Sequence, residues 1–341
     1  MKILITGGCG FVGSNLAIFL KKRIKNANVL SLDNLIRKGS EVNEKRLKRE
    51  KITNLRIDVS NSKKIGNLRR FNLIIDCCAE PAIEASKKNP DQVFNTNLVG
   101  TYNILKKCIK DKSNIIFLSS SRVYSIKPLK KLIKNLDLKK PLKIDKTIDE
   151  HFETDAASSL YGFTKLASEK LIKEFFYEKK MKYIINRFGV IAGPWQFGKQ
   201  DQGFVPLWVA RHFFKKKLSY IGFGGEGHQV RDIIHINDVC RIILLQIKKI
   251  NKINNLTFNI GGGFKNYTSL KNLTNKCIKL TGNKVLIKKV KRTSNYDIPY
   301  YITNNSKIFK TYRWKPEINL DETLKDIYSW LVKNNMRDYF K

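Results

Sequence analysis

The chain has 341 residues, of which 42% are hydrophobic and 11% aromatic, and this composition excludes a disordered tail or a small disulfide-stapled scaffold because it can bury a core. Lys and Arg number 66 against 29 Asp and Glu, which gives a formal net charge of +37. A charge of this size attracts phosphate groups of any kind, so nucleic acids and small phosphorylated ligands are both candidate partners.

The cysteine pattern bears on the compartment of the protein. Six cysteines are scattered along the chain, with no CxxC pair and no alternation with the four histidines. This pattern predicts reduced thiols, no metal site and a cytoplasmic protein. No signal peptide is expected, because only residues 3–5 form an apolar run before the first glycines. No apolar stretch approaches the roughly 18 residues that would cross a bilayer, so no membrane association is expected.

Short apolar runs alternate with longer amphipathic stretches through the first half of the chain. These near-continuous runs lie at 3–5, 29–32, 55–57, 73–75 and 115–118. They predict buried parallel strands joined by helices, and hence an α/β fold with a doubly wound, Rossmann-type sheet. Such sheets bind ligands at the carboxyl ends of their strands, so the residues after each run are the candidate site residues.

A Lys-rich stretch at 125–155, containing Pro128 and Pro141, interrupts this alternation. A loop of this length inside a domain is either a solvated decoration or a functional lid, and both interpretations stay open. After it, the sequence predicts a helix over 161–178 and another strand over 183–187.

The rest of the chain predicts a second, smaller region. Beyond residue 193 the sequence is richer in Trp and Gly, and it ends in a helical pattern over 320–333. We predict a cofactor-binding domain at 1–190 and a smaller α/β lobe at 191–341. This lobe is expected mainly to bind substrate and to send some segments back to the first domain. Two domains agree with a chain of this length, at about 150 residues per domain.

A Gly-rich turn follows the first predicted strand and opens a helix. Gly8, Gly10 and Gly13 match G-x-G-x-x-G, in which glycines allow a tight turn and a close approach of the backbone to a pyrophosphate. Asp33 ends the second strand about 20 residues later, where a carboxylate can bind an adenosine ribose. Strand, turn, helix and acid together favour a dinucleotide site over a plain turn. Asp33 favours NAD over NADP, although two basic residues beyond it could accept a phosphate, Arg37 and Lys38.

Polar side chains that can move a proton follow the fifth strand and open the next long helix. Tyr161 and Lys165 are four residues apart and are expected on one helical face. An ammonium beside a phenol lowers the pKa of the phenol toward a useful range. A serine hydroxyl at the strand end could hold a substrate hydroxyl. These groups can remove a proton from an alcohol whose hydride leaves for a nicotinamide.

Three segments together resemble the extended short-chain dehydrogenase/reductase superfamily, and within it the NAD-dependent nucleotide-sugar epimerases and dehydratases. They are the turn at 6–13, Ser119–Tyr124 and Tyr161–Lys165. Asn97–Thr101 and Gln229–Asp238 add further similarity, so the resemblance covers nearly the whole chain. It implies an enzyme that forms a homodimer or a higher homo-oligomer.

The resemblance also implies roles for individual residues. The implied catalytic residues are Ser120, Tyr161 as base and Lys165 as its electrostatic partner, with the two serines adjacent to Ser120 as alternatives. The implied cofactor is NAD, retained and regenerated in each turnover. Its implied binding residues are Gly7, Gly8, Gly10, Phe11, Val12, Gly13, Asp33, Asn34, Asp58, Val59, Cys78, Ala79, Asn97, Tyr161 and Lys165. The implied substrate-binding residues are Glu80, Ser121, Arg122, Gln202, Gly203, Arg231 and Arg292.

Two of these residues, Arg231 and Arg292, match arginines that hold the diphosphate of a nucleotide sugar in this family. Guanidinium groups suit this task because they bind phosphate oxygens in a bidentate manner. The structural alternative for Arg231 is an ion pair with Asp232 or Asp238.

Loop segments resemble a narrower branch of the family, the CDP-paratose 2-epimerases. These segments are 33–39, 77–81, 193–204 and 219–225. The branch implies inversion of C2 of a CDP-linked deoxyhexose, from CDP-paratose to CDP-tyvelose, through a keto intermediate. It also implies a place in the biosynthesis of lipopolysaccharide or another cell-surface polysaccharide. The expected partner is therefore a CDP-linked nucleotide sugar.

Two positions depart from the common pattern of the superfamily, and other functions stay open. Asp76 stands where many members have histidine, and Val190 where asparagine is common, which argues against a simple 4-epimerase mechanism. A 4,6-dehydratase needs an extra acid and base where Ser121 and Arg122 stand, whereas a 4-epimerase or 4-reductase would use the same Tyr–Lys pair. A nucleotide-sensing, nucleic-acid-binding regulator is disfavoured, because the lysines are spread along the chain without an arginine–aromatic stripe.

Overall fold

The computed structural model describes residues 1–81, 88–133, 137–140, 146–156, 158–199 and 202–340. The chain divides into two compact units, and each is built from segments that are not contiguous in the sequence. The first unit consists of Met1–Val123, Ser159–Arg187 and Cys240–Phe258. The second unit consists of Tyr124–Ser158, Phe188–Val239 and Asn259–Lys341.

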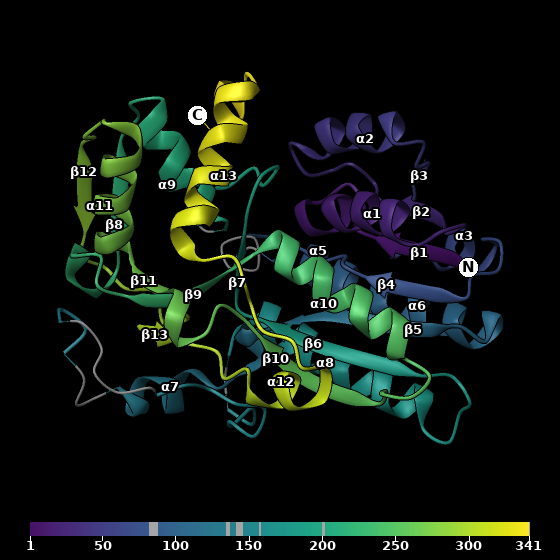
Figure 1. Ribbon diagram of the computed structural model, residues 1–341. Coiled ribbons are helices and arrows are strands. Elements are labelled where there is room, and N and C mark those ends of the chain that lie inside the picture. The colour runs from purple at the N-terminus through teal and green to yellow at the C-terminus, as the bar shows by residue number, and fades with distance from the viewer. Residues whose placement is uncertain (82–87, 134–136, 141–145, 157, 200–201, 341) are drawn as a thin grey trace. The chain divides into compact units, whose positions relative to one another are not determined.

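A seven-stranded sheet forms the centre of the first unit, in the order β10-β6-β5-β4-β1-β2-β3 (Figure 1). The strands are β1 (Lys2–Thr6), β2 (Asn28–Leu32), β3 (Asn54–Leu55), β4 (Leu73–Asp76), β5 (Asn114–Ser120), β6 (Tyr183–Phe188) and β10 (Leu256–Ile260). β1 pairs in parallel with both β2 and β4, so the connections run outward in two directions from β1. This arrangement confirms the predicted α/β, doubly wound fold, and it places the ligand-binding position of such folds at the carboxyl ends of these strands.

Strand register aligns apolar side chains across one face of this sheet. Leu4 pairs with Leu30 and with Ile74, and Ile74 pairs with Ile115. These side chains belong to one buried cluster with residues of α3, α6 and α8, including Ile104 and Ile172. Because each such side chain contributes about 1.5–3 kcal/mol on burial, this cluster fixes α6 and α8 against the sheet.

The helices of the first unit follow its strands in the βαβ pattern. They are α1 (Phe11–Arg23), α2 (Ser40–Arg49), α3 (Ser62–Gly66), α5 (Pro90–Phe94), α6 (Gly100–Asp111), α8 (Leu160–Phe176) and α10 (Ile236–Lys249), which begins in the second unit. A π-helical turn at Asn95–Val99 precedes α6, and a 3₁₀ turn at Ser121–Val123 follows β5. Ser159 caps α8, since its hydroxyl accepts a hydrogen bond of 3.0 Å from the Gly162 N–H. This cap fixes the start of the helix one residue before Tyr161.

The second unit combines small sheets with helices. Its strands are β7 (Val190–Ala192), β8 (Leu218–Ile221), β9 (Val230–His235), β11 (Tyr267–Ser269), β12 (Ile287–Val290) and β13 (Tyr300–Tyr301). β9 pairs with β7, β11 and β13, while β8 pairs in parallel with β12. Its helices are α7 (Ile126–Leu132), α9 (Phe204–Phe213), α11 (Leu270–Thr281), α12 (Ser306–Tyr312) and α13 (Leu320–Lys333). α9, α11 and α13 share one core that contains Trp208 and Trp330.

The Lys-rich stretch at 125–155 has buried parts. α7 lies within it and buries Leu129, and Ile148 is also buried. The Ile148 N–H donates a hydrogen bond of 2.8 Å to the Ile302 carbonyl, so this stretch is joined to the second unit. Pro141 lies outside the described residues, as do residues 200 and 201 of the segment at 193–204.

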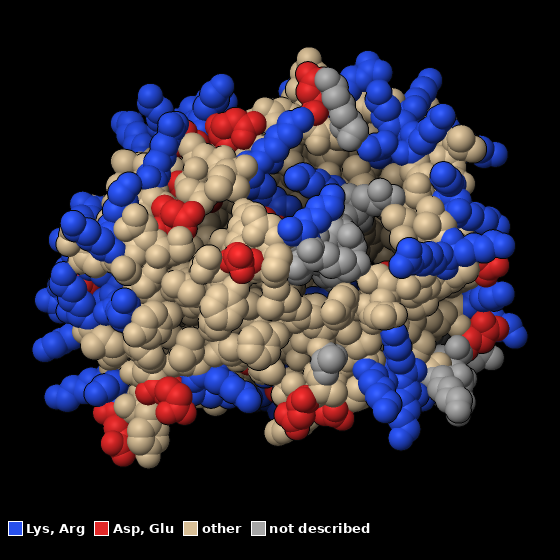
Figure 2. All heavy atoms as spheres, turned by 180° about the vertical axis from the view of Figure 1, so that it is seen from behind, with Lys and Arg blue, Asp and Glu red and all other residues tan. Residues whose placement is uncertain are grey.

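The positive charge is distributed and not gathered into one patch on the visible face. In Figure 2, Lys and Arg side chains project from many separate places, with acidic and uncharged residues between them. None of the helices in the described ranges is both long and apolar enough to span a membrane. Over those same ranges, no group of three or more His, Cys, Asp and Glu could hold a metal ion.

Candidate active site

The Gly-rich turn between β1 and α1 exposes bare backbone at the start of a helix. Gly7 has a φ of +60°, a conformation that glycine adopts without strain. A Cβ at Gly13 would lie 2.2 Å from the Gly7 carbonyl oxygen, so no larger residue fits where α1 meets the turn. No acidic side chain occupies the first turn of α1. A helix N-terminus of this kind suits the pyrophosphate of a dinucleotide.

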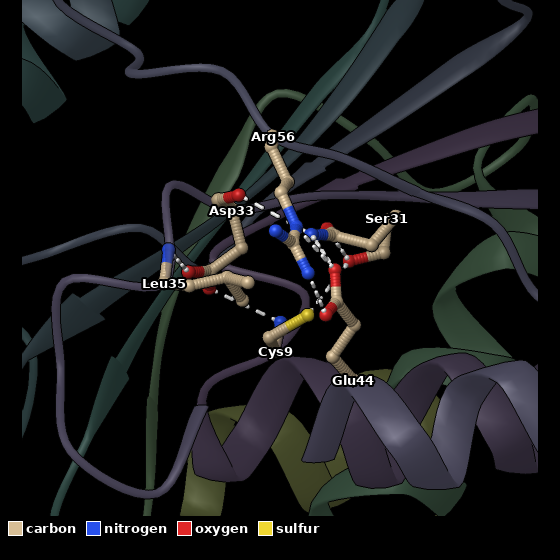
Figure 3. Close-up of polar contacts among 7 residues, drawn as sticks. Cys9, Ser31, Asp33, Leu35, Glu44 and Arg56 are labelled. Atoms are coloured by element: carbon tan, nitrogen blue, oxygen red, sulfur yellow. Dashed lines mark hydrogen bonds and ion pairs between the residues drawn. The ribbon is translucent and has the colours of Figure 1, made fainter. Parts of the chain in front are cut away.

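Asp33, which follows β2, is oriented by backbone amides (Figure 3). Its carboxylate accepts hydrogen bonds of 3.1 Å from the Cys9 N–H and 2.9 Å from the Leu35 N–H. Burial raises the pKa of this carboxyl, and these amide hydrogen bonds oppose the rise. Burial and the Asp33 charge also raise the pKa of the Cys9 thiol to about 12, so this thiol is inert at neutral pH.

An ion pair lies beside Asp33 in the same view. Arg56 binds Glu44 in a bidentate manner, at 3.0 and 2.6 Å. Asn54 donates to Glu44 and accepts from the Ser31 hydroxyl, so this polar network ties α2 to β2 and β3.

Of the other predicted cofactor residues, Asn34 donates a hydrogen bond of 2.7 Å to Asp58. A Cβ at Gly100 would lie 2.6 Å from the Val59 side chain, so α6 closely approaches the loop between β3 and α3 that carries Asp58 and Val59.

At the end of β4, the side chain of Asp76 is buried and hydrogen-bonded at both oxygens. One oxygen accepts from the Thr6 hydroxyl at 2.5 Å and from the Cys78 N–H at 3.2 Å. The other accepts from the Thr101 hydroxyl at 3.2 Å. Sequence reasoning singled out Asp76 as a departure from the family pattern but did not identify these partners.

The loop after β4 is held through Asn97 in the π-helical turn. The Asn97 carboxamide accepts from the Glu80 N–H at 2.8 Å and donates to the Glu80 carbonyl at 3.2 Å. It also donates to the Thr164 hydroxyl on α8 at 3.1 Å. π-helical turns are often found at functional sites. Here the turn fixes the loop that carries Ala79 and Glu80 against the helix that carries Tyr161.

Tyr161 and Ser120 meet where α8 passes the end of β5. The Tyr161 phenol is hydrogen-bonded to the Ser120 hydroxyl, which lowers the pKa of the phenol. Burial is the larger effect and raises this pKa, the positive charge of Arg122 lowers it, and Glu80 raises it. Ser120 also accepts a hydrogen bond of 3.1 Å from the Arg122 N–H. The structure therefore brings Ser120, Tyr161, Arg122 and Glu80 together.

Ser119, which was one alternative to Ser120, has a different partner. Its hydroxyl donates a hydrogen bond of 2.5 Å to Glu169, one turn beyond Lys165 on α8. Arg187 at the end of β6 binds the same carboxylate, with its closest contact at 2.7 Å. Sequence reasoning missed this buried cluster of Ser119, Glu169 and Arg187, although the four-residue spacing from Lys165 to Glu169 places both on one helical face.

Lys165 is buried with its ammonium over an aromatic ring. Its Nζ lies 4.3 Å from the centre of the Phe117 ring. Burial lowers the pKa of this ammonium, and the charge of Asp76 is the largest effect that opposes it. In the part of the chain that the structure describes, this ammonium has no hydrogen-bond acceptor. A buried donor group in this state suits a polar ligand such as the hydroxyls of a cofactor ribose.

Four of the predicted substrate-binding residues lie in the second unit, namely Gln202, Gly203, Arg231 and Arg292. Arg231 donates hydrogen bonds to the carbonyls of Val230 and Ile298, at 2.7 and 2.6 Å. Arg292 is exposed, and Gly203 caps α9 with a φ of +75°. The Gln202 side-chain oxygen is buried and has no hydrogen-bond partner among the residues described. Their predicted contacts with a substrate stay predictions.

Comparisons with known proteins agree on the type of protein. The family model described as "NAD dependent epimerase/dehydratase family" matches residues 3–261. A CDP-paratose 2-epimerase of Salmonella typhi is 28% identical, over 97% of this chain and 99% of its own length. A putative UDP-glucose 4-epimerase of Methanocaldococcus jannaschii is also 28% identical, over 98% and 99%.

Solved structures give the same fold. The UDP-glucose 4-epimerase of Thermotoga maritima, determined with UDP-glucose, superimposes with a TM-score of 0.80 at 25% identity and covers 98% of this chain and 99% of its own. The UDP-glucose 4-epimerase of Thermus thermophilus, in complex with NAD, has a TM-score of 0.79 at 19% identity and covers 97% of this chain and 99% of its own. The architecture expected from the sequence is therefore confirmed.

Proposed function

The chain belongs to the NAD dependent epimerase/dehydratase family, and we propose that it is a nucleotide-sugar epimerase that inverts C2 of a CDP-linked deoxyhexose. The observation that carries this proposal is the hydrogen-bonded Ser120–Tyr161 pair, which lies on the helix of the buried Lys165. We propose that residues 1–190 bind the cofactor and that the lobe at 191–341 mainly binds the sugar nucleotide. We also propose that the reaction takes place in the cytoplasm and serves the synthesis of a cell-surface polysaccharide.

NAD is the cofactor, because the family is NAD-dependent, and this confirms the prediction from the Gly-rich turn and Asp33. The residues present fit NAD. The turn at Gly7 to Gly13 presents bare backbone at the N-terminus of α1, where a pyrophosphate can bind, and Asp33 offers a carboxylate that accepts from the Cys9 N–H in this turn. The Lys165 ammonium offers hydrogen-bond donors to a ribose. When bound, NAD supplies a hydride acceptor that can return the hydride in the same turnover.

Tyr161 is the proposed base for the sugar hydroxyl. Burial raises the pKa of its phenol, while the Ser120 hydroxyl and the Arg122 charge favour the phenolate. The phenolate form takes the proton when the hydroxyl is oxidised, and the phenol returns it when the ketone is reduced. Ser120 would hydrogen-bond the same sugar oxygen, which fixes the reacting carbon.

The choice of a CDP sugar and of C2 rests on similarity. The relative from Salmonella typhi aligns over nearly both full lengths, and the loops at 33–39 and 193–204 resemble the same branch. Arg231, Arg292, Gln202 and Gly203 are the proposed contacts to the sugar nucleotide.

A 4-epimerase is the second candidate, and a specific finding favours it. The putative UDP-glucose 4-epimerase of Methanocaldococcus jannaschii is as similar to this chain as the CDP-paratose 2-epimerase is. A 4,6-dehydratase is less favoured, because a cation, Arg122, acts on Tyr161 where the extra acid would be needed.

The proposed partner protein is a second copy of the chain, bound through α6 and α8. α6 and α8 carry exposed apolar side chains, among them Tyr102, Ile109 and Phe163. Apolar groups exposed on neighbouring helices are typical of an interface. Sedimentation equilibrium tests this proposal, and a monomer at micromolar concentration would contradict it.

The substrate is tested by incubating the purified protein with a panel of CDP-, UDP-, GDP- and dTDP-sugars and resolving the products by NMR. Inversion at C2 of a CDP-deoxyhexose is the expected result. Inversion at C4 of a UDP-sugar would overturn the proposed substrate and support the second candidate. Loss of water to a 4-keto-6-deoxy sugar would identify a dehydratase.

A further inference from the structure

A row of side chains crosses three strands at the centre of the first unit. Strand register aligns Thr6 of β1 with Asp76 of β4, and Asp76 with Phe117 of β5. The same register puts these three on the sheet face that α6 and α8 cover, because Ile74 and Ile115, two residues earlier, belong to that packed cluster. Asp76 is only 1% exposed there.

Lys165 reaches this row from α8. It is 2% exposed, and its Nζ lies 4.3 Å from the centre of the Phe117 ring. Because Phe117 is the register partner of Asp76, the ammonium and the carboxylate lie over neighbouring strands, beside the carboxyl end of β4.

The partners of Asp76 leave its negative charge unbalanced. It accepts hydrogen bonds from two hydroxyls and one amide, those of Thr6, Thr101 and Cys78, and in the described ranges no other group is hydrogen-bonded to it. All three donors are neutral. A buried carboxylate without a cation is costly, so a positive charge nearby stabilises it.

The other titratable groups that influence the pKa of Lys165 are either paired with a cation or neutral. They are Glu169, Cys77 and Cys78. Glu169 is bound by the Arg187 guanidinium, so its charge has a partner. Burial raises the pKa of both cysteine thiols, which are therefore neutral at physiological pH. Asp76 is thus the carboxylate whose charge Lys165 can balance.

We propose that Asp76 is the counter-ion of Lys165 and thereby a positioning residue for the Tyr161–Lys165 pair. The proposal rests on the proposed function for the role of that pair. The Asp76 charge keeps the buried ammonium protonated, while the hydrogen bonds from Thr6, Thr101 and Cys78 hold the carboxylate in place. The three N–H donors of Lys165 then stay available to a cofactor. This assigns a role to the position where the chain departs from the histidine of similar proteins.

NMR titration of [ε-¹³C]lysine in the full chain tests the proposal directly. The Lys165 resonance is the one that disappears in Lys165→Arg. The Phe117 ring should shift this resonance away from those of the surface lysines. We expect Asp76→Asn, which keeps the size of the side chain, to lower the titration midpoint of Lys165 by about one pH unit or more. The matched control is Thr101→Val, which removes a hydrogen bond to Asp76 but keeps its charge and should leave the midpoint unchanged. An unchanged midpoint in Asp76→Asn, or an equal fall in both variants, overturns the proposal.

A second variant and a second readout keep the test decisive. If Asp76→Asn does not fold, Asp76→His removes the same negative charge with the residue that similar chains carry there. In turnover assays of the Asp76 variant, the alkaline limb of the pH profile should move to lower pH by the same interval as the Lys165 titration midpoint. The kcat near neutral pH should be much less affected. The NMR titration needs no sugar nucleotide. A shifted midpoint in a protein that converts no sugar would therefore refute the proposed function and leave the counter-ion assignment intact.

Discussion

The candidate site of the first unit has two ends that handle charge differently. At the β1–β2 end, formed by Cys9, Asp33, Glu44 and Arg56, the Arg56 side chain is 69% exposed and binds Glu44 directly. At the β4–β5 end, formed by Asp76, Ser120, Tyr161 and Lys165, the titratable side chains are buried. At the first end, burial raises the pKa of Asp33, whose carboxylate is held by the backbone amides of Cys9 and Leu35. At the second end, burial raises the pKa of Tyr161 and lowers that of Lys165.

This difference separates binding from chemistry along one sheet edge. The buried phenol of Tyr161 and the buried ammonium of Lys165 are groups that can take part in proton transfer, whereas the Asp33 carboxylate is held by two backbone amides in a position that suits a ribose. The β1–β2 end is therefore expected to control cofactor affinity, and the β4–β5 end to control turnover. Variants at the two ends should separate these quantities.

The largest effect is expected at the β4–β5 end. Tyr161→Phe removes the proposed base while keeping the ring, so kcat should fall by about 10²–10⁴-fold with NAD affinity unchanged. Steady-state kinetics on the converted sugar and calorimetric titration with NAD measure the two quantities. The matched control is Tyr177→Phe, at the end of the same helix and 70% exposed, which should behave as wild type. Full activity in Tyr161→Phe would refute the role of this residue.

The ion pairs near the two ends should differ in their contribution to stability. Glu169→Gln leaves the buried Arg187 without its partner, and we expect the free energy of unfolding to fall by about 3 kcal/mol. Glu44→Gln, at the exposed pair with Arg56, should have a far smaller effect because water can solvate the remaining cation. Urea unfolding of the two variants gives the comparison. Equal losses would show that burial is not what distinguishes these pairs.

A smaller effect is expected on cofactor affinity at the β1–β2 end. Asp33→Asn removes the negative charge and keeps one side-chain oxygen, which can accept from one of the two backbone amides, Cys9 or Leu35, that now donate to separate carboxylate oxygens. Since hydrogen bonds to charged groups contribute about 1.5–3 kcal/mol, the Kd for NAD should rise about tenfold or more. Discrimination against NADP should weaken, with kcat at saturating NAD retained. If NAD and NADP affinities changed by the same factor, Asp33 would not be the residue that distinguishes them.

The pH dependence of stability provides the smallest predicted effect. Because burial raises the pKa of Tyr161, the folded chain holds this proton more tightly than the unfolded chain. The stability it contributes is present below the ordinary phenol pKa of about 10 and is lost as the pH rises through the folded-state value. Relative to Tyr161→Phe, wild type should lose up to about 1.4 kcal/mol per pH unit between the ordinary phenol pKa and the raised folded-state pKa. Urea unfolding across this range measures it, and a constant difference between the two proteins would contradict the assignment.

Local pattern in the sequence was enough to predict most strands of the central sheet, whereas the choice of Ser120 came from the family resemblance. The apolar runs at 3–5, 29–32 and 73–75 fall within β1, β2 and β4. The apolar run at 55–57 predicted the third strand less accurately, because β3 is limited to Asn54–Leu55. The choice of Ser120 over Ser119 agrees with the geometry, since Ser120 meets Tyr161 and Ser119 meets Glu169.

Contacts that depend on strand register could not be predicted in this way. Thr6 and Asp76 are 70 positions apart, and only the pairing of β1 with β4 brings them together. The sequence predicted that Lys165 lowers the pKa of Tyr161, but burial raises this pKa, and the effects that lower it come from Ser120 and Arg122. The position of a long side chain could not be predicted, and the Lys165 ammonium lies over Phe117. Arg231 was expected to bind a diphosphate or an aspartate, and two of its donors bind main-chain carbonyls.

Isotope exchange during turnover tests the central proposal most directly. The sugar nucleotide that the enzyme converts is incubated in ²H₂O, and the product is examined by NMR and mass spectrometry. An epimerase that uses Tyr161 and retained NAD predicts an inverted carbon without deuterium and no accumulation of reduced cofactor. Deuterium at the inverted carbon, a product that has lost water, or no conversion of any sugar nucleotide in the panel would contradict it.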